Sequence, residues 1–209
     1  SIGTPEGTIT AVTLSSMDAF FIIVFQLAVS AFVMRFRPLA AMMGGILILA
    51  GGLALMFSNQ NSWLILLGIL IFALGEMASS PKFTEYVGRI APEDKKALYM
   101  GTSFLPIAAG HQLAGWLSGG VYEKIADKIY LLQKETAIMD ISLPEISEEV
   151  TKNDYLELAA QKMSMTTNEL SDYLWTRHNP SDIWIVYTGV AVMAVILLWV
   201  YDKLILKSR

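Results

Sequence analysis

Five runs of apolar residues, each long enough to cross a lipid bilayer as a helix, constrain this chain more than any other feature of its sequence. A spanning helix needs about 20 mostly apolar residues. Only 16% of the chain is charged, whereas a soluble domain carries about 25% charged residues. We therefore predict an all-α, polytopic membrane helix bundle. The runs cover approximately Val12–Met34, Leu39–Phe57, Trp63 to Glu76 and onward, Ala97–Tyr122, and Ile183–Tyr201.

The charged residues divide the chain into three parts. Residues 122–182 hold 12 Asp and Glu against 6 Lys and Arg, a net charge of −6, while the remainder carries +2. We interpret residues 1–121 as four membrane helices, residues 122–182 as an acidic helical insert, and residues 183–209 as the last membrane helix with its tail. Within the insert, periodicity predicts an amphipathic continuation over residues 122–137, a helix near Asn153–Met163, and another opened by a capping box at Thr166–Glu169.

Basic residues in the short loops predict the orientation. Short cytoplasmic loops carry the excess of Lys and Arg, so we expect the C-terminus in the cytoplasm, residues 122–182 outside it, and the protein in the cytoplasmic membrane. An odd number of spans that begins outside favours a C-terminal fragment of a longer protein over a processed five-helix protein. The basic residues used are Arg35, Arg37, Lys82, Arg89, Lys95, Lys96, Lys203, Lys207 and Arg209.

Glu76 is the strongest functional candidate. It follows 13 uncharged residues, which places it about 20 Å along a helix that rises about 1.5 Å per residue. An ionised carboxylate inside a bilayer is costly unless it is paired, protonated or facing water, so such acids are functional candidates. The alternative is a structural acid that pairs with a basic residue on a neighbouring helix.

Several weaker candidates accompany Glu76. Ser79, Ser80 and Pro81 follow it directly, and a proline kink beside an acid suits a binding site or hinge, although it can also be a kink alone. Asp18, near the outer end of the first span, is either a site residue or an interfacial acid. His111, near the middle of the fourth span, is either a titrating group or an interhelical contact. We expect close helix packing at glycines 44, 45, 51, 52, 110, 115 and 119.

Other classes of protein find little support. The chain has no Cys, and its insert has a single His, His178, so a metal site is not expected. We find no Ser/His/Asp grouping, phosphate-binding glycine loop or dinucleotide fingerprint, and therefore no case for an enzyme. The overall charge of −4 gives no indication of nucleic-acid binding.

Several motifs resemble those of the proton-coupled oligopeptide transporters, a family of the major facilitator superfamily. The sequence Gly75-Glu76-Met77-Ala78-Ser79-Ser80-Pro81 resembles the G-E-(L/M)-x-x-S-P of the family's tenth helix. Residues 90–92 (IAP), 100–105 (MGTSFL) and 108–111 (AAGH) are similar to its L-A-P, M-G-x-W-F-L and A-x-G-N, and residues 16–22 to the S-(I/L)-N-P-x-F-I of helix eight. On this resemblance the five spans are helices eight to twelve of a major facilitator fold.

The resemblance implies a proton-driven carrier of di- and tripeptides that works with an N-terminal half and uses no cofactor besides the coupling proton. Glu76 would bind the amino terminus of the peptide, with Ser80 beside it. Asp18 aligns with a peptide-binding Asn, and Phe104 with the Phe of W-F-L. Ser103 stands where the family has Trp, and His111 where it has Asn.

Two other functions stay open at this level. One is a different major-facilitator carrier, for drugs, sugars or nucleosides. The other is a non-transporting membrane scaffold that recruits partners through the acidic insert.

Overall fold

The computed structural model describes residues 11–58, 61–147 and 150–206, and every regular element within these ranges is a helix. The chain forms two compact units. One consists of the residues up to Ala109 together with those from Trp184 onward, and the other is Gly110–Ile183. The boundary therefore falls within the expected fourth span, whereas we had expected it at residue 122.

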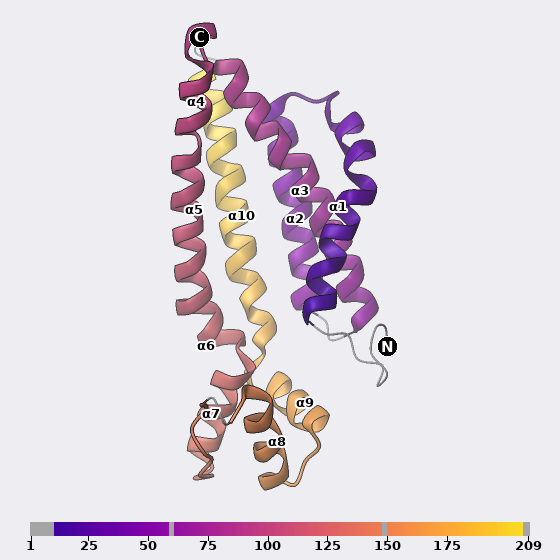
Figure 1. Ribbon diagram of the computed structural model, residues 1–209, viewed down its shortest axis with the longest axis vertical. Coiled ribbons are helices and arrows are strands. Elements are labelled where there is room, and N and C mark those ends of the chain that lie inside the picture. Colours follow the sequence, from indigo (N-terminus) through magenta and orange to yellow (C-terminus); the bar gives the residue numbers. More distant parts are fainter. Residues whose placement is uncertain (1–10, 59–60, 148–149, 207–209) are drawn as a thin grey trace. The chain divides into compact units, whose positions relative to one another are not determined.

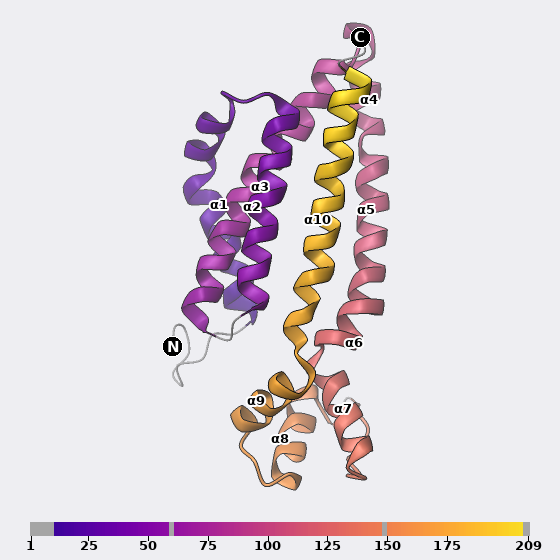
Figure 2. The same ribbon diagram turned by 180° about the vertical axis from the view of Figure 1, so that it is seen from behind.

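Three long helices of the first unit, α1 (Ala11–Val33), α2 (Pro38–Phe57) and α3 (Ser62–Ile90), lie side by side (Figure 1, Figure 2). Local signals explain where two of them begin. Pro38 starts α2, since a proline is tolerated in the first turn. The side chain of Asn61 caps α3 by accepting a hydrogen bond of 2.9 Å from the amide of Trp63.

α2 and α3 approach each other closely along a seam of glycines. A Cβ added to Gly45 would lie 2.7 Å from the carbonyl oxygen of Gly75, and one added to Gly52 would lie 2.5 Å from the amide nitrogen of Phe72. Gly68 and Gly75 supply the matching small positions on α3. This confirms the predicted packing role at Gly45 and Gly52. The other glycines named for packing (44, 51, 110, 115 and 119) have open space where a Cβ would be.

Figure 2 shows α10 (Ile183–Val200), and side chains of α10 and of the π-helical stretch that follows it, Tyr201–Leu206, contact α2 and α3 at two levels. At one level the rings of Phe57 and Tyr187 have centroids 5.8 Å apart. At the other, the hydroxyl of Tyr86 donates a hydrogen bond of 2.8 Å to that of Tyr201. The end of α10 therefore meets the end of α3 and the start of α2, where the basic residues are concentrated.

The expected fourth span is not one long helix. It consists of α4 (Lys96–Thr102), α5 (Phe104–Leu117), a π-helical stretch Ser118–Tyr122 and α6 (Glu123–Ala126). Pro106 explains the first break, because it has no amide with which to bond the carbonyl of Thr102. A short 3-10 turn, Glu93–Lys95, precedes α4.

Four described stretches are long and apolar enough to cross a membrane, one fewer than expected. They indicate a membrane protein. Their outward side chains agree, since Ile23 and Leu27 on α1 are 79% and 84% exposed, and soluble proteins rarely expose large contiguous apolar surfaces. The four stretches are Ser16–Val33, Pro38–Phe57, Ser62–Ile90 and Pro180–Leu204.

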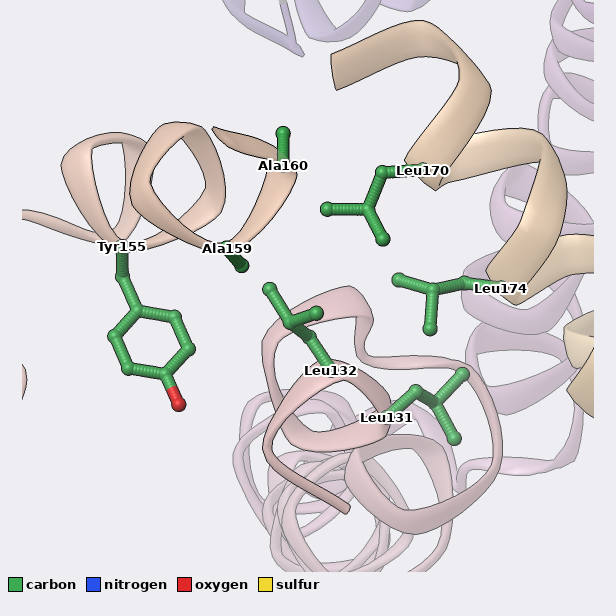
Figure 3. Close-up of a cluster of buried hydrophobic side chains, with 7 residues drawn as sticks. All are labelled: Leu131, Leu132, Tyr155, Ala159, Ala160, Leu170 and Leu174. Carbon is green, nitrogen blue, oxygen red and sulfur yellow. The ribbon is translucent and has the colours of Figure 1, made fainter. Parts of the chain in front are cut away.

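The second unit has its own small core, formed by α7 (Lys128–Ile138), α8 (Lys152–Lys162) and α9 (Thr167–His178). Figure 3 shows the buried side chains that meet there, among them Leu132 and Leu170, which are fully buried. The predicted capping box at Thr166 and Glu169 is confirmed. The continuation expected over residues 122–137 is interrupted at Asp127, whose extended backbone ends α6 and whose carboxylate caps α7. A 3-10 turn, Pro180–Asp182, leads into α10.

Candidate functional site

Glu76 occupies the middle of α3, equally far from its first residue, Ser62, and its last, Ile90. At a rise of about 1.5 Å per residue, the carboxylate is about 21 Å from either end of the helix. Its side chain is half-buried, next to the buried Gly75 and Met77. A membrane-spanning α3 would therefore hold this carboxylate at the depth where ionised groups are most costly.

Asp18 on α1 is close enough to Glu76 for the charges of the two carboxylates to influence each other. One carboxylate oxygen of Asp18, Oδ1, is buried and accepts no hydrogen bond from the described residues. Two like charges repel, and neither has a fixed cation among the residues that the structure describes. Two carboxylates without a permanent salt bridge can take up a proton or a cation.

A groove beside Asp18 gives this pair an opening. Its volume is about 330 Å³, and apolar side chains form the rest of its lining, including Leu53 of α2 and Phe72 of α3. Phe72 lies one helical turn before Glu76, so the groove and Glu76 share a face of α3. A small organic ligand in this groove would contact the carboxylate of Asp18 directly. The carboxylate of Glu76 lies one turn of α3 beyond Phe72.

The residues that follow Glu76 change the hydrogen bonding of the α3 backbone. α3 continues through Pro81, which cannot donate an amide hydrogen bond to the carbonyl of Met77. The hydroxyl of Ser79 donates to the carbonyl oxygens of Gly75 and Glu76, at 2.9 and 3.3 Å. Such hydrogen bonds often bend helices. Ser79 therefore bonds to the backbone of its own helix, α3. Ser80 is exposed, with its side chain open to an additional partner.

The remaining expected site residues do not join the Asp18–Glu76 pair. The hydroxyl of Ser103 donates to the carbonyl of Met100 at 2.7 Å and so belongs to the break between α4 and α5. Phe104, the first residue of α5, is 66% exposed. His111 is exposed on the part of α5 that belongs to the second unit.

Lys82 is a buried cation that sequence reasoning assigned to a cytoplasmic loop. It lies inside α3 and is 3% exposed. Its amine donates to the carbonyl of Phe36 at 3.2 Å and pairs with Glu85 at 2.7 Å. Lys82 therefore ties the loop between α1 and α2 to α3.

A second buried charge, Glu135, lies in the other unit and was also missed. It is 2% exposed, accepts a hydrogen bond of 3.2 Å from the hydroxyl of Tyr173, and has Nε2 of His178 2.9 Å from Oε1. Burial and then the charge of Glu135 raise the pKa of Tyr173, which keeps its hydroxyl a donor. The signal in the sequence was a carboxylate four residues after Leu131, on the apolar face of α7. Its partners hold α7 to α9, so we assign it a structural role.

Metal binding has no geometric basis in the described part of the chain. Within residues 11–58, 61–147 and 150–206, no three His, Asp or Glu side chains gather closely enough to hold an ion. His178 is instead next to Glu135.

Comparison with known proteins identifies no relative. No family model, curated protein or solved structure matches the chain. The case for a function therefore depends on the geometry of the site and on the motifs quoted from the sequence.

Proposed function

We propose that this chain is the C-terminal part of a major-facilitator-type carrier that moves small peptides across the cytoplasmic membrane together with protons. One observation carries the proposal: Glu76, in the middle of the longest apolar helix, interacts with a second acid and has no cationic partner among the described residues. A permanent structural acid would be paired, because an unpaired charge at this depth is costly. We therefore propose that a proton or a substrate cation reaches Glu76 from outside the described part of the chain.

The proposed cation is the amino terminus of a di- or tripeptide, alternating with a proton. Ionised Glu76 binds the peptide ammonium by a charge-assisted hydrogen bond. Proton binding to the carboxylate removes that attraction and favours release. Asp18, on α1, offers a second acceptor for ammonium or amide groups. Substrate sites near the midplane between two halves are typical of alternating-access carriers, so we propose an N-terminal half opposite this face.

The proposed orientation in the membrane depends on the basic residues at the ends of the helices. Arg37 and Arg89 gather where α2 begins and α3 ends, together with the end of α10. We propose that this end faces the cytoplasm, because cytoplasmic loops carry the excess of Lys and Arg. The acidic residues 122–182 would then lie outside.

Competition for uptake tests the substrate class. Proteoliposomes that hold the full-length protein would be supplied with labelled dialanine in the outer medium under an inward proton gradient. We expect unlabelled dipeptides to compete, while free alanine, glucose and uridine do not. N-acetyl-dialanine, which lacks the ammonium group, should also fail to compete.

Two results would reject the peptide proposal. Competition by glucose or uridine in place of dipeptides would assign the chain to another class of major-facilitator carrier. Equal competition by N-acetyl-dialanine would remove the ammonium–carboxylate contact from the mechanism.

A further inference from the structure

A small pocket opens where the start of α2, the last turns of α3 and the end of α10 meet. Its volume is about 220 Å³. The side chains of Arg37, Arg89, Tyr86 and Asp202 line it together with the first turn of α2. It lies at the opposite end of α2 from the groove beside Asp18, so it plays no part in the site described above.

The pocket has more positive than negative charge. Arg37 lies 3.7 Å from Asp202, and its side chain is 78% exposed. Arg89 pairs with Glu85 at 2.5 Å, is 66% exposed, and shares that carboxylate with Lys82. Three cations thus share two carboxylates. A guanidinium has five N–H donors, so both arginines keep donors for another acceptor.

The first turn of α2 adds backbone donors. Arg37 occupies the N-cap position, and its side chain does not cap the helix. Pro38 has no amide, and the first intrahelical bond runs from the amide of Ala41 to the carbonyl of Arg37. The amides of Leu39 and Ala40 precede that bond, so they have no acceptor within the helix. Such amides and the helix dipole favour an anion.

The surroundings indicate which anion. Helix ends such as these lie at the level of the lipid headgroups, where basic pockets between spans bind anionic lipids. Exposed apolar side chains flank the pocket's elements: Met34 and Phe36 precede α2, and Leu204 follows Asp202. A free phosphate ion gains nothing from these apolar side chains, whereas the acyl chains of a phospholipid can pack against them.

We propose that this pocket binds the phosphodiester headgroup of an anionic phospholipid. Arg37 and Arg89 hold the phosphate oxygens, and the amides at the start of α2 complete the site. Asp202 competes with the lipid for Arg37. The inference is independent of the transport function proposed above, because it involves neither Glu76 nor Asp18.

Lipid titration of the purified full-length protein tests the site. Isothermal titration with dihexanoylphosphatidylglycerol should give saturable binding that dihexanoylphosphatidylcholine and inorganic phosphate do not match. Arg37→Gln and Arg89→Gln should each weaken it about tenfold or more, since each removes charge-assisted hydrogen bonds. Arg35→Gln is the matched control, because Arg35 is an exposed cation of the same loop outside the pocket. It should change the affinity less than twofold.

Asp202→Asn guards against an indirect effect of the arginine variants on folding. It leaves both arginines in place and removes the competing carboxylate, so we expect tighter binding of the lipid. Weaker binding by Asp202→Asn would overturn the proposal. An effect of Arg35→Gln equal to that of Arg37→Gln would also overturn it, by showing a diffuse charge effect. Equal affinity for inorganic phosphate would replace the lipid with the free ion.

Discussion

Neighbouring glycines on α2 differ sharply in what surrounds them. A Cβ on Gly52 would collide with the backbone of Phe72, whereas one on Gly51 would meet nothing within 4 Å. We predict that Gly52→Ala destabilises the protein by about 1–3 kcal/mol, the usual cost of overpacking. Gly51→Ala, the matched control, should be neutral or slightly stabilising because alanine favours a helix. Thermal unfolding in detergent measures both, and equal effects would contradict the close approach of α2 and α3.

Sequence reasoning singled out two acids as candidates but not the buried lysine. Glu76 and Asp18 were recognisable because charges within long apolar runs are rare. Their interaction was not predictable, because it depends on how α1 packs against α3. Lys82 resembled a loop residue because it follows Pro81, yet the helix continues to Ile90. Its acceptor, the carbonyl of Phe36, is distant in the sequence.

Whether a helix forms was easier to predict than whether it is continuous. Apolar runs predicted α1, α2, α3 and α10 closely. Two prolines had opposite outcomes: α3 passes through Pro81, while the helix before Pro106 breaks at Ser103. In α3 the tight packing against α2 holds the helix together around the missing hydrogen bond. α5 has no buried residue to give such support.

The caps of α8 and α9 were partly readable. Thr166 and Glu169 fit the usual capping box, while the box at Thr151 was missed because its third residue is Asp154 rather than Glu or Gln. Both boxes have the same geometry. The threonine hydroxyl accepts a hydrogen bond from the amide of the acid, and the carboxylate of the acid accepts one from the amide of the threonine.

The capping box of α9 predicts a pH dependence. The hydrogen bond from the amide of Thr166 to Glu169, at 2.7 Å, together with that from the Thr166 hydroxyl, holds the pKa of this carboxyl below its ordinary 4.5. A lowered pKa in the folded state stabilises α9 above about 4.5, the value in the unfolded chain. That stabilisation is lost as the pH falls through the lower value of the folded state.

Hydrogen exchange of α9 in the full-length protein, corrected for the intrinsic effect of pH, measures this loss. Glu169→Gln should remove that part of the pH dependence. Glu157→Gln, a change of an exposed acid in α8, should leave it as in the wild type. The assignment would be contradicted if α9 of the wild type were equally protected above pH 4.5 and below the lowered pKa of Glu169.

For the whole molecule, charge distribution predicted a membrane part and an acidic helical part that begins at residue 122, and this division stays a prediction; the two compact units meet at residues 109 and 110. The two divisions differ because hydropathy continues through residues 110–122, whereas the compact units depend on which segments pack together. The core of the second unit was only outlined by periodicity, since contacts such as Leu132 with Leu170 join helices that are far apart in the sequence.

The central claim is that Glu76 exchanges a proton for a substrate cation. Peptide-driven proton influx into proteoliposomes that contain the full-length protein tests it most directly. Glu76→Gln keeps the size of the side chain but cannot ionise, so we predict that influx falls to the level of empty liposomes. Glu93→Gln, at an exposed acid in the turn before α4, should retain wild-type influx. Undiminished influx in Glu76→Gln would contradict the account.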